Sequence, residues 1–249
     1  MHPITQSLQS IYNAHAKHFS QTRKKHRPEI DHIIDYINTL PQKTLTVVEL
    51  GCGDWRLYEY LTKETTKTIK YTGVDIADKL LDIGKKSYPQ AHFIHTDMIS
   101  FVQQGKQESV DMVISIAAFH HLATRKDRLI VLKNIYRLLK YDGHIIMTNR
   151  ALSQRFAKKY WKSLYTSITK RIVSIGQKDR RDVYIPWNRQ WDRYYHIFSK
   201  KQIENLSRQS WFYPIQNCYI LANGKLSQEQ KYARNIFTIC QKSIRKHSL

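Results

Sequence analysis

Five short apolar runs alternate with helical stretches over residues 44–149, and this alternation constrains the fold more than any other feature. The runs are Thr44–Leu50, Ile69–Ile76, Ala91–Asp97, Val110–Ala117 and His144–Asn149. Val110–Ala117 is almost continuously apolar, as expected of a central parallel strand that is buried on both faces. The stretches between the runs have helical spacing, and Thr124–Lys140 is strongly amphipathic. Strands that alternate with helices predict an α/β fold with a doubly wound, mostly parallel sheet.

The remaining segments add helices before this core and a less regular part after it. Helices are predicted over Ile4–Phe19, Glu29–Leu40 and Ser199–Gln209, and a strand over Phe212–Leu221. Arg234–Lys242 could be helix or strand, but its Ile, Phe and Thr content favours a strand. We therefore expect a seven-stranded sheet with an antiparallel last strand. One domain is predicted over 1–249, with N-terminal helices over about 1–40 and a basic insertion over about 150–192 after the fifth strand.

The chain is strongly basic, which points to a polyanionic partner. Lys and Arg number 41 against 20 Asp and Glu, a net charge of +21. Lys17–Arg27 has five cations and no acid, and Arg150–Arg181 has ten cations, one acid and several interleaved aromatic residues. Cations among aromatics suit RNA, whose bases stack and whose phosphates need positive charge. The alternatives are a generally basic proteome and a basic amphipathic helix whose aromatics pack on the core.

Other sequence features exclude several classes of protein. No apolar run approaches the roughly 20 residues that span a bilayer, and the N-terminal residues lack the order of a signal peptide. Cys52, Cys218 and Cys240 are odd in number and far apart, so we interpret them as free thiols in a reducing cytoplasm. No Cys/His spacing indicates a metal site. We expect a cytoplasmic protein without a membrane partner.

The first apolar run leads into Glu49-Leu-Gly51-Cys-Gly53, a turn of the kind that approaches a nucleotide cofactor. A dinucleotide fold would continue to a third glycine, but position 56 is arginine. Instead, an acid stands two residues before the first glycine, and Asp75 and Asp97 end the second and third predicted strands. An acid at the second strand end can accept hydrogen bonds from both ribose hydroxyls, and one at the third can accept from an adenine amino group.

This order of acids and glycines resembles the first motifs of class I S-adenosylmethionine-dependent methyltransferases. The resemblance implies a Rossmann-like methyltransferase fold and S-adenosylmethionine as cofactor. The residues expected to bind it are Glu49, Gly51, Gly53, Asp75, Ile76, Asp97, Met98 and Ser115. Trp55 departs from the pattern, because many such enzymes have a further glycine there. Its ring either packs over the first helix or forms part of the cofactor pocket.

Four further stretches resemble a narrower family, the tRNA wobble-uridine carboxymethyl methyltransferases. They are Tyr12–Arg23, Ser115–Arg128, Asp182–Trp187 and Arg193–Phe198. The resemblance implies methyl esterification of 5-carboxymethyluridine at the first anticodon position of tRNA. It also implies a small activator protein, which eukaryotic members need. Besides Trp55, the chain departs from the family in the short Asn188–Asp192 connection and in Asp142-Gly143, where the family usually has two glycines.

The family motifs supply the candidate catalytic residues. A carboxylate nucleophile is already ionised at neutral pH, so it needs orientation rather than a general base. Arg23 and Arg193 are expected to hold it, because the guanidinium fork binds a carboxylate through two donors. His120 and His121 follow the fourth strand, where open α/β sheets bind ligands. The expected catalytic set is Arg23, His120, His121, Arg193, Tyr194 and His196, with Trp187 and Tyr195 as further candidates for stacking on the base.

Two other functions are compatible with these residues. One is a small-molecule carboxyl or amine methyltransferase whose basic charge is incidental. The other is a non-catalytic RNA-binding relative that keeps the fold. The salt dependence of substrate binding separates the first alternative from a tRNA enzyme, and cofactor binding excludes or supports the second.

Overall fold

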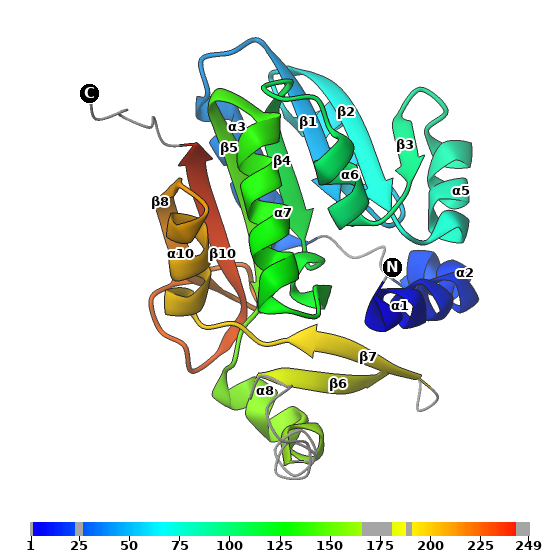
Figure 1. Cartoon of the computed structure of the whole chain (residues 1–249), viewed down its shortest axis with the longest axis vertical. Coiled ribbons are helices and arrows are strands. Elements are labelled where there is room, and N and C mark those ends of the chain that lie inside the picture. The colour runs from blue at the N-terminus through cyan, green and yellow to red at the C-terminus, as the bar shows by residue number, and fades with distance from the viewer. Residues whose placement is uncertain (1, 23–26, 166–180, 188–190, 243–249) are drawn as a thin grey trace.

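A mixed, mostly parallel sheet forms the centre of the molecule (Figure 1). The computed structural model describes residues 2–22, 27–165, 181–187 and 191–242. The sheet contains β1 (Thr44–Leu50), β2 (Thr68–Asp75), β3 (His92–His95), β4 (Val110–Ile116), β5 (Leu139–Arg150), β8 (Phe212–Leu221), β9 (Leu226–Ser227) and β10 (Ala233–Lys242). Their order is β3-β2-β1-β4-β5-β10-β8-β9, with β10 antiparallel to both β5 and β8. The predicted α/β class I methyltransferase fold is confirmed.

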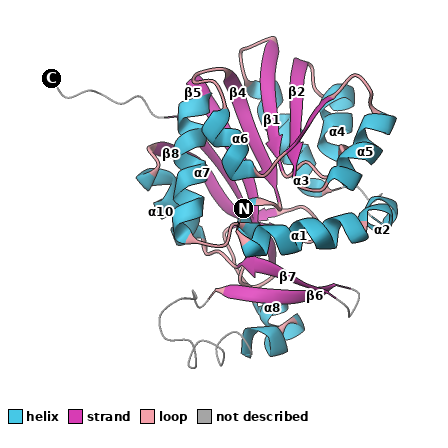
Figure 2. Ribbon diagram, turned by 45° about the vertical axis from the view of Figure 1, so that its right-hand side comes forward, coloured by secondary structure: helices cyan, strands magenta, loops and turns pink. Residues whose placement is uncertain are grey.

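Helices cover both faces of the sheet, as in a doubly wound fold (Figure 2). The helices are α3 (Pro28–Thr39), α4 (Arg56–Glu64), α5 (Asp78–Ser87), α6 (Met98–Gln104), α7 (Arg125–Leu138) and α10 (Lys200–Gln209). Apolar residues of α6, α7 and α10 pack in one core cluster, and those of α3, α4 and α5 pack in another on the opposite face. Local signals set the helix starts: Pro28 begins α3, and Thr124 and Asp127 form a capping box before α7.

Three details differ from the sequence-based expectations. The two-residue strand β9 adds an eighth strand, because the chain after β8 turns back and pairs with Tyr219 and Ile220. Strand β5 begins at Leu139, so α7 ends earlier than predicted and no separate turn precedes the strand. Part of the predicted insertion forms a separate hairpin of β6 (Asp182–Trp187) and β7 (Trp191–His196). Residues 166–180 of that insertion lie outside the described part of the chain.

The hairpin and the N-terminal helices gather at the carboxyl ends of the parallel strands (Figures 1 and 2). These helices are α1 (Pro3–Ala14) and α2 (Ala16–Thr22). Helix α8 (Gln154–Lys159) packs under the hairpin, where Phe156, Val183, Ile185, Tyr195 and Ile197 form a small core of their own. Segments that precede β1 and segments that follow β5 therefore enclose the carboxyl ends of the parallel strands, where α/β sheets bind ligands.

Among the described residues, no helix is both long enough and apolar enough to cross a bilayer. Within the same residues, no three His, Cys, Asp or Glu side chains gather as metal ligands would.

Candidate active site

The turn after β1 requires glycine at two positions. Gly51 and Gly53 both have positive φ angles, of 76° and 60°. A Cβ on Gly51 would lie 2.3 Å from the Cβ of Ala118, so a side chain there would collide with the segment that follows β4. The Gly51 amide donates to the Val74 carbonyl at 2.7 Å, which ties the turn to the end of β2. The backbone can therefore approach a ligand closely.

Asp75 lies at the end of β2 and is fixed by the backbone around it. One carboxylate oxygen accepts a hydrogen bond from the Gly53 amide at 2.8 Å, and the other accepts from the Ala77 amide at 2.8 Å. Burial raises the pKa of Asp75, and these amide bonds oppose that rise. A carboxylate offers about four acceptor positions, so two remain for ligand hydroxyls.

Glu49 is a buried acid at the end of β1. It is 3% exposed, and its carboxyl accepts a hydrogen bond from the Tyr71 hydroxyl at 2.6 Å. Burial is the main cause that raises the pKa of Glu49 to about 8. The Tyr71 hydrogen bond and the positive charges of Arg27 and Arg56 oppose this rise in the pKa without cancelling it.

Most of the residues expected to bind the cofactor line one pocket. The pocket wall includes Glu49, Gly51, Gly53, Asp75, Ile76, Asp97 and Met98. Asp97 also caps α6, because it accepts hydrogen bonds from the Ile99 and Ser100 amides at 2.9 and 3.0 Å. Ser115 is not part of this wall: it is 2% exposed, and its hydroxyl donates to the Leu50 carbonyl at 3.2 Å beneath the turn.

Several wall residues were not identified from the sequence. Asp54 is buried and forms an ion pair with Arg56 at 3.2 Å, and both line the pocket. The Arg56 guanidinium lies 5.9 Å from the centre of the Phe19 ring. Leu8, Tyr12 and Phe19 bring the N-terminal helices to the pocket. Asp54 directly follows Gly53, and this position next to the glycine motif could have identified it as a pocket residue. No local sequence pattern shows that α1 and α2 cover the pocket.

Trp55 packs behind the turn rather than in the pocket wall. It has a φ angle of 81°, a conformation that favours glycine and is strained for a large side chain. Its ring centre lies 4.9 Å from that of Tyr88, and it contacts the core cluster under α3 and α4. Of the two interpretations drawn from the sequence, this position matches packing over the first helix.

His120 and His121 form the short helix η1 (Phe119–His121) directly after β4. The Arg150 amide donates to Nδ1 of His120 at 3.3 Å, and the His120 ring stacks on Tyr195 at 4.8 Å. Burial, assisted by nearby cationic groups, lowers the pKa of His120 well below its usual value. His121 lines the cofactor pocket, and its Nδ1 donates to the Tyr194 carbonyl at 2.7 Å.

One face of β7 points toward these histidines. Arg193 places its guanidinium carbon 4.3 Å from the centre of the Trp187 ring and 5.5 Å from that of Tyr195. The Tyr12 hydroxyl hydrogen bonds with Arg193 and also lies 3.1 Å from Nε2 of His121. Tyr12 and His121 therefore connect the cofactor pocket with the side chains of this strand face.

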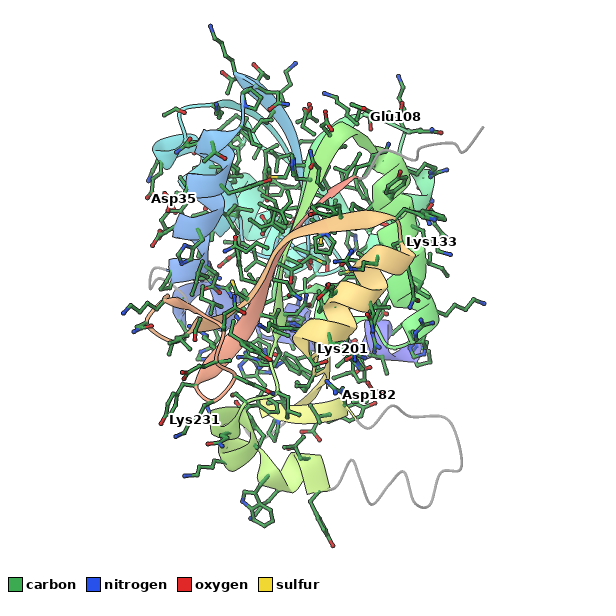
Figure 3. The ribbon with its side chains drawn as sticks, turned by 90° about the vertical axis from the view of Figure 1, so that its left-hand side faces the viewer. Asp35, Glu108, Lys133, Asp182, Lys201 and Lys231 are labelled. Atoms are coloured by element: carbon green, nitrogen blue, oxygen red, sulfur yellow. The ribbon has the colours of Figure 1, made fainter. Side chains whose placement is uncertain are left out.

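The other face of β7 is occupied by a buried polar network. The Tyr194 hydroxyl donates to Asp182 at 2.7 Å, and Nδ1 of His196 lies 2.7 Å from the same oxygen. Arg128 donates to the Tyr194 hydroxyl at 3.2 Å, and its guanidinium lies 3.7 Å from Asp182. Figure 3 shows Asp182 near the start of α10. In that helix, Nε2 of Gln202 lies 2.8 Å from Nε2 of His196.

The structure thus separates the candidate catalytic residues into two groups. His120, His121 and Arg193 lie together beside the pocket, with Trp187 and Tyr195. Tyr194 and His196 point to the opposite face, because successive side chains of a strand alternate. Arg23 lies outside the described residues.

Comparison with known proteins identifies the domain that contains the pocket. A family profile for a methyltransferase domain matches residues 48–147, which carry the glycine turn and the strand-end acids. The chain contains a methyltransferase domain. Solved structures that share the fold include a methyltransferase in complex with the Haloferax volcanii Trm112 methyltransferase activator. It has a TM-score of 0.66 and 16% identity, with 97% of this chain and 100% of that chain covered.

Among curated relatives, the methyltransferase resembles tRNA (carboxymethyluridine(34)-5-O)-methyltransferases. It is 32% identical over 157 residues to ALKBH8 of Macaca fascicularis. The alignment covers 63% of this chain and 22% of that protein. It is 26% identical over 180 residues to the enzyme of that name in Saccharomyces cerevisiae, with 72% and 56% covered. The chain spans about a fifth to two fifths of the length of the first three relatives it matches.

The residues of the methyltransferase fit its cofactor. S-adenosylmethionine, the cofactor expected from the sequence, is confirmed by the methyltransferase domain. One solved structure with the same fold, a methyltransferase of Burkholderia thailandensis, has S-adenosylhomocysteine bound. The pocket matches this group in three respects: Gly51 leaves room beside Ala118, Asp75 keeps free acceptors, and Glu49 places an acid near the turn. When bound, the cofactor supplies an electrophilic methyl group.

Proposed function

We propose that this methyltransferase esterifies the carboxylate of 5-carboxymethyluridine at the wobble position of tRNA. The observation that carries the proposal is the connection made by Tyr12 and His121. These residues line the cofactor pocket and contact Arg193 and the backbone of β7, respectively. A carboxylate held by Arg193 would therefore stand next to the cofactor. The names of the relatives support the same substrate.

The proposed reaction needs no acid or base from the protein. A carboxylate oxygen attacks the methyl carbon, so an O–CH₃ bond forms as the S–CH₃ bond breaks, leaving a methyl ester and a neutral thioether. No proton is exchanged. His120 is uncharged at neutral pH because its pKa is lowered, which suits a role in shaping the site rather than in proton transfer. Arg193 orients the nucleophile, and orientation can contribute on the order of 7–11 kcal/mol.

A basic surface beside the hairpin supports a nucleic-acid substrate. Helix α8 carries Lys158 and Lys159, and Trp161 and Tyr165 follow with exposures of 59% and 64%. The Lys162 ammonium lies 5.6 Å from the Trp161 ring. Exposed aromatics beside cations offer a stacking and phosphate-binding surface for RNA. In this proposal the tRNA lies across α8 and delivers its wobble base to Arg193.

A small activator protein and a cytoplasmic location complete the proposal. The structural neighbour from Haloferax volcanii was solved with a methyltransferase activator. We therefore include such an activator as a partner in the assay described next.

The experiment supplies the purified chain with S-adenosylmethionine carrying a tritiated methyl group. The substrates are tRNA that contains 5-carboxymethyluridine and the same tRNA with unmodified uridine, each with and without a Trm112-type activator. A methyl ester is hydrolysed by mild base, whereas methyl groups on ring or ribose atoms remain. Base-labile label on the carboxymethylated tRNA alone is the expected result.

Other outcomes would contradict the proposal. Label that survives base would indicate transfer to another atom. Transfer to free carboxylates, with tRNA inactive, would favour a small-molecule enzyme. In binding measurements, alanine at Lys158, Lys159 and Lys162 should make log K less steep against log salt by about 0.7–0.9 per lost phosphate contact. An unchanged slope would separate α8 from the tRNA surface.

A further inference from the structure

Arg150 at the end of β5 is a half-buried cation for which the sequence offered no specific role. Its Nη1 donates to the Arg234 carbonyl at 3.3 Å, and its backbone amide donates to His120. Its Nε is buried and has no hydrogen-bond partner among the described residues. A buried donor on a charged group without an acceptor is destabilising, so its position needs an explanation.

Arg193 shares this property. Its Nε and Nη1 are also buried without an acceptor in the part of the chain that the structure describes. His120 and Tyr195 connect the two arginines: the Arg150 amide donates to His120, His120 stacks on Tyr195, and the Tyr195 ring lies 5.5 Å from the Arg193 guanidinium. We call Arg150, Arg193, His120, Tyr195 and the neighbouring Tyr160 the arginine cluster.

The surroundings of the cluster carry positive charge and aromatic rings. The groups that act on Arg150 are Tyr195, Arg234, Tyr160 and Arg193, and those that act on Arg193 are Tyr195, Tyr12 and Tyr160. None of these is a carboxylate. Burial is the main cause that lowers the pKa of Arg150, and the cationic Arg234 and Arg193 add to it. Among the described residues, no carboxylate is seen to act on either guanidinium group.

We propose that Arg150 and Arg193 together form the site that binds an oxyanion of the substrate nucleotide. This inference deepens the proposed function and rests on it for the choice of nucleotide. Two forks, each with several donors, match the oxygen atoms of a carboxylate or a phosphate. Trp187 lies against the Arg193 guanidinium and is only partly buried, so its ring can offer an aromatic face to the attached base. Tyr195 is buried against His120 and holds Arg193 in place. Arg150 is then a specificity-determining residue.

The two sources of the oxyanion are the carboxylate on the base and a phosphate of the backbone. Calorimetry in the presence of S-adenosylhomocysteine separates them without methyl transfer. The probes are the nucleoside 5-carboxymethyluridine, uridine 5′-monophosphate and neutral uridine. Wild-type protein should bind at least one anionic probe about tenfold or more tightly than uridine, the scale of a charge-assisted pair. The probe that gains identifies the source.

Arg150→Gln is the decisive variant, and Arg234→Gln is its matched control. Arg234 is exposed and lies on the neighbouring strand, so the control removes the same charge while its carbonyl stays in place. Arg150→Gln should weaken the favoured anionic probe about tenfold, and Arg234→Gln should stay within about twofold. Equal binding by Arg150→Gln and wild type would overturn the proposal, as would an equal preference for uridine.

Two measurements guard against a misfolded variant. S-adenosylhomocysteine affinity should be unchanged, because Arg150 is not in that pocket wall. Should Arg150→Gln lose that affinity, Arg150→Lys replaces it, since lysine keeps the charge but not the fork. It should weaken the anionic probe about threefold or more, and unchanged binding would overturn the proposal. A tRNA assay without ester product, together with a clear Arg150→Gln effect, would refute the proposed function but retain the oxyanion site.

Discussion

The cofactor pocket and the arginine cluster lie at the same end of the sheet, but they differ in whether their polar groups already have hydrogen-bond partners. In the pocket, both oxygens of Asp75 already accept backbone hydrogen bonds, and Tyr71 donates to Glu49. In the cluster, Nε of Arg150 and both Nε and Nη1 of Arg193 have no acceptor among the described residues. The pocket is organised before its ligand binds, whereas in our proposal the cluster is completed by an oxyanion of the substrate.

This contrast explains why the hairpin carries its own stabilising network. A cation with unsatisfied donors destabilises the segment that holds it, and Arg193 lies in the hairpin strand β7. On the opposite face of β7, Asp182 accepts hydrogen bonds from Tyr194 and His196 and lies near Arg128. We infer that the hydrogen-bonded network on the Tyr194 face of β7 keeps the hairpin folded. The opposite face can therefore hold Arg193, two of whose donors lack an acceptor among the described residues. Four changes test this division, from the largest expected effect to the smallest.

Asp182→Ala should have the largest effect and should act on folding. It leaves Arg128 without its carboxylate and Nδ1 of His196 without its acceptor, and it removes one of two acceptors near the Tyr194 hydroxyl, all in buried positions. Loss of one partner of a buried charged network costs about 3–5 kcal/mol in the free energy of unfolding. Urea denaturation measures this loss. S-adenosylhomocysteine affinity should persist below the transition, and a loss under 1 kcal/mol, on the scale of an exposed pair, would mean that the network does not anchor the hairpin.

Asp75→Ala should show the reverse, with a large effect on binding. Its remaining acceptor positions are expected to receive the ribose hydroxyls of the cofactor. Their loss should weaken S-adenosylmethionine by about 1.5–3 kcal/mol, the value for hydrogen bonds to a charged group. Calorimetry on the folded variant gives the number. Unchanged affinity would remove Asp75 from the binding site.

Glu49 should make cofactor binding depend on pH. The free protein holds the proton, because burial raises the pKa of Glu49 to about 8. A cationic ligand beside it favours the carboxylate, so binding releases a proton. Affinity for S-adenosylmethionine should rise by up to about tenfold per pH unit as the pH approaches 8 and then level off, one proton per ligand.

Calorimetry in buffers of different ionisation enthalpy measures the released proton directly. Glu49→Gln should give a flat profile over the same pH range. A slope that persists in this variant would assign the proton to another group.

Trp55→Gly should have the smallest effect on binding. Glycine relieves the positive φ angle but leaves a gap against Tyr88, and the lost packing should outweigh the relief. Stability should fall, while cofactor affinity should change by less than about threefold, under about 1 kcal/mol. Thermal unfolding and calorimetry measure the two quantities. A larger loss of affinity at preserved fold would place Trp55 in the pocket.

Much of the cofactor side could be predicted from the sequence because its signals are local. A buried strand, two glycines and an acid at the next strand end stand close together, and parallel strands bring such ends to one edge. Asp54 is not predicted because the motif is defined by Glu49 and the two glycines, and Asp54 follows the last of them. Position 55, where the methyltransferase pattern predicts glycine, has a positive φ angle although it is tryptophan.

The substrate side could not be predicted to the same extent, because its arrangement is tertiary. Arg150 meets Arg193 only when β5 and the hairpin come together, and no spacing in the sequence shows this. Tyr194 and His196 were grouped with Arg193 because they are adjacent in one motif. Because side chains alternate along β7, Tyr194 and His196 lie on the opposite face from Arg193. This strand is defined by its pairing with Asp182–Trp187, which is a tertiary feature.

The alternation along β7 also limits which changes of length the protein tolerates. An insertion or deletion of one residue between Arg193 and His196 would shift every following side chain to the opposite face. The anchor and the binding surface would then exchange places in a single step. The number of residues between Arg193 and His196 is therefore fixed by the arrangement of the two faces of the strand.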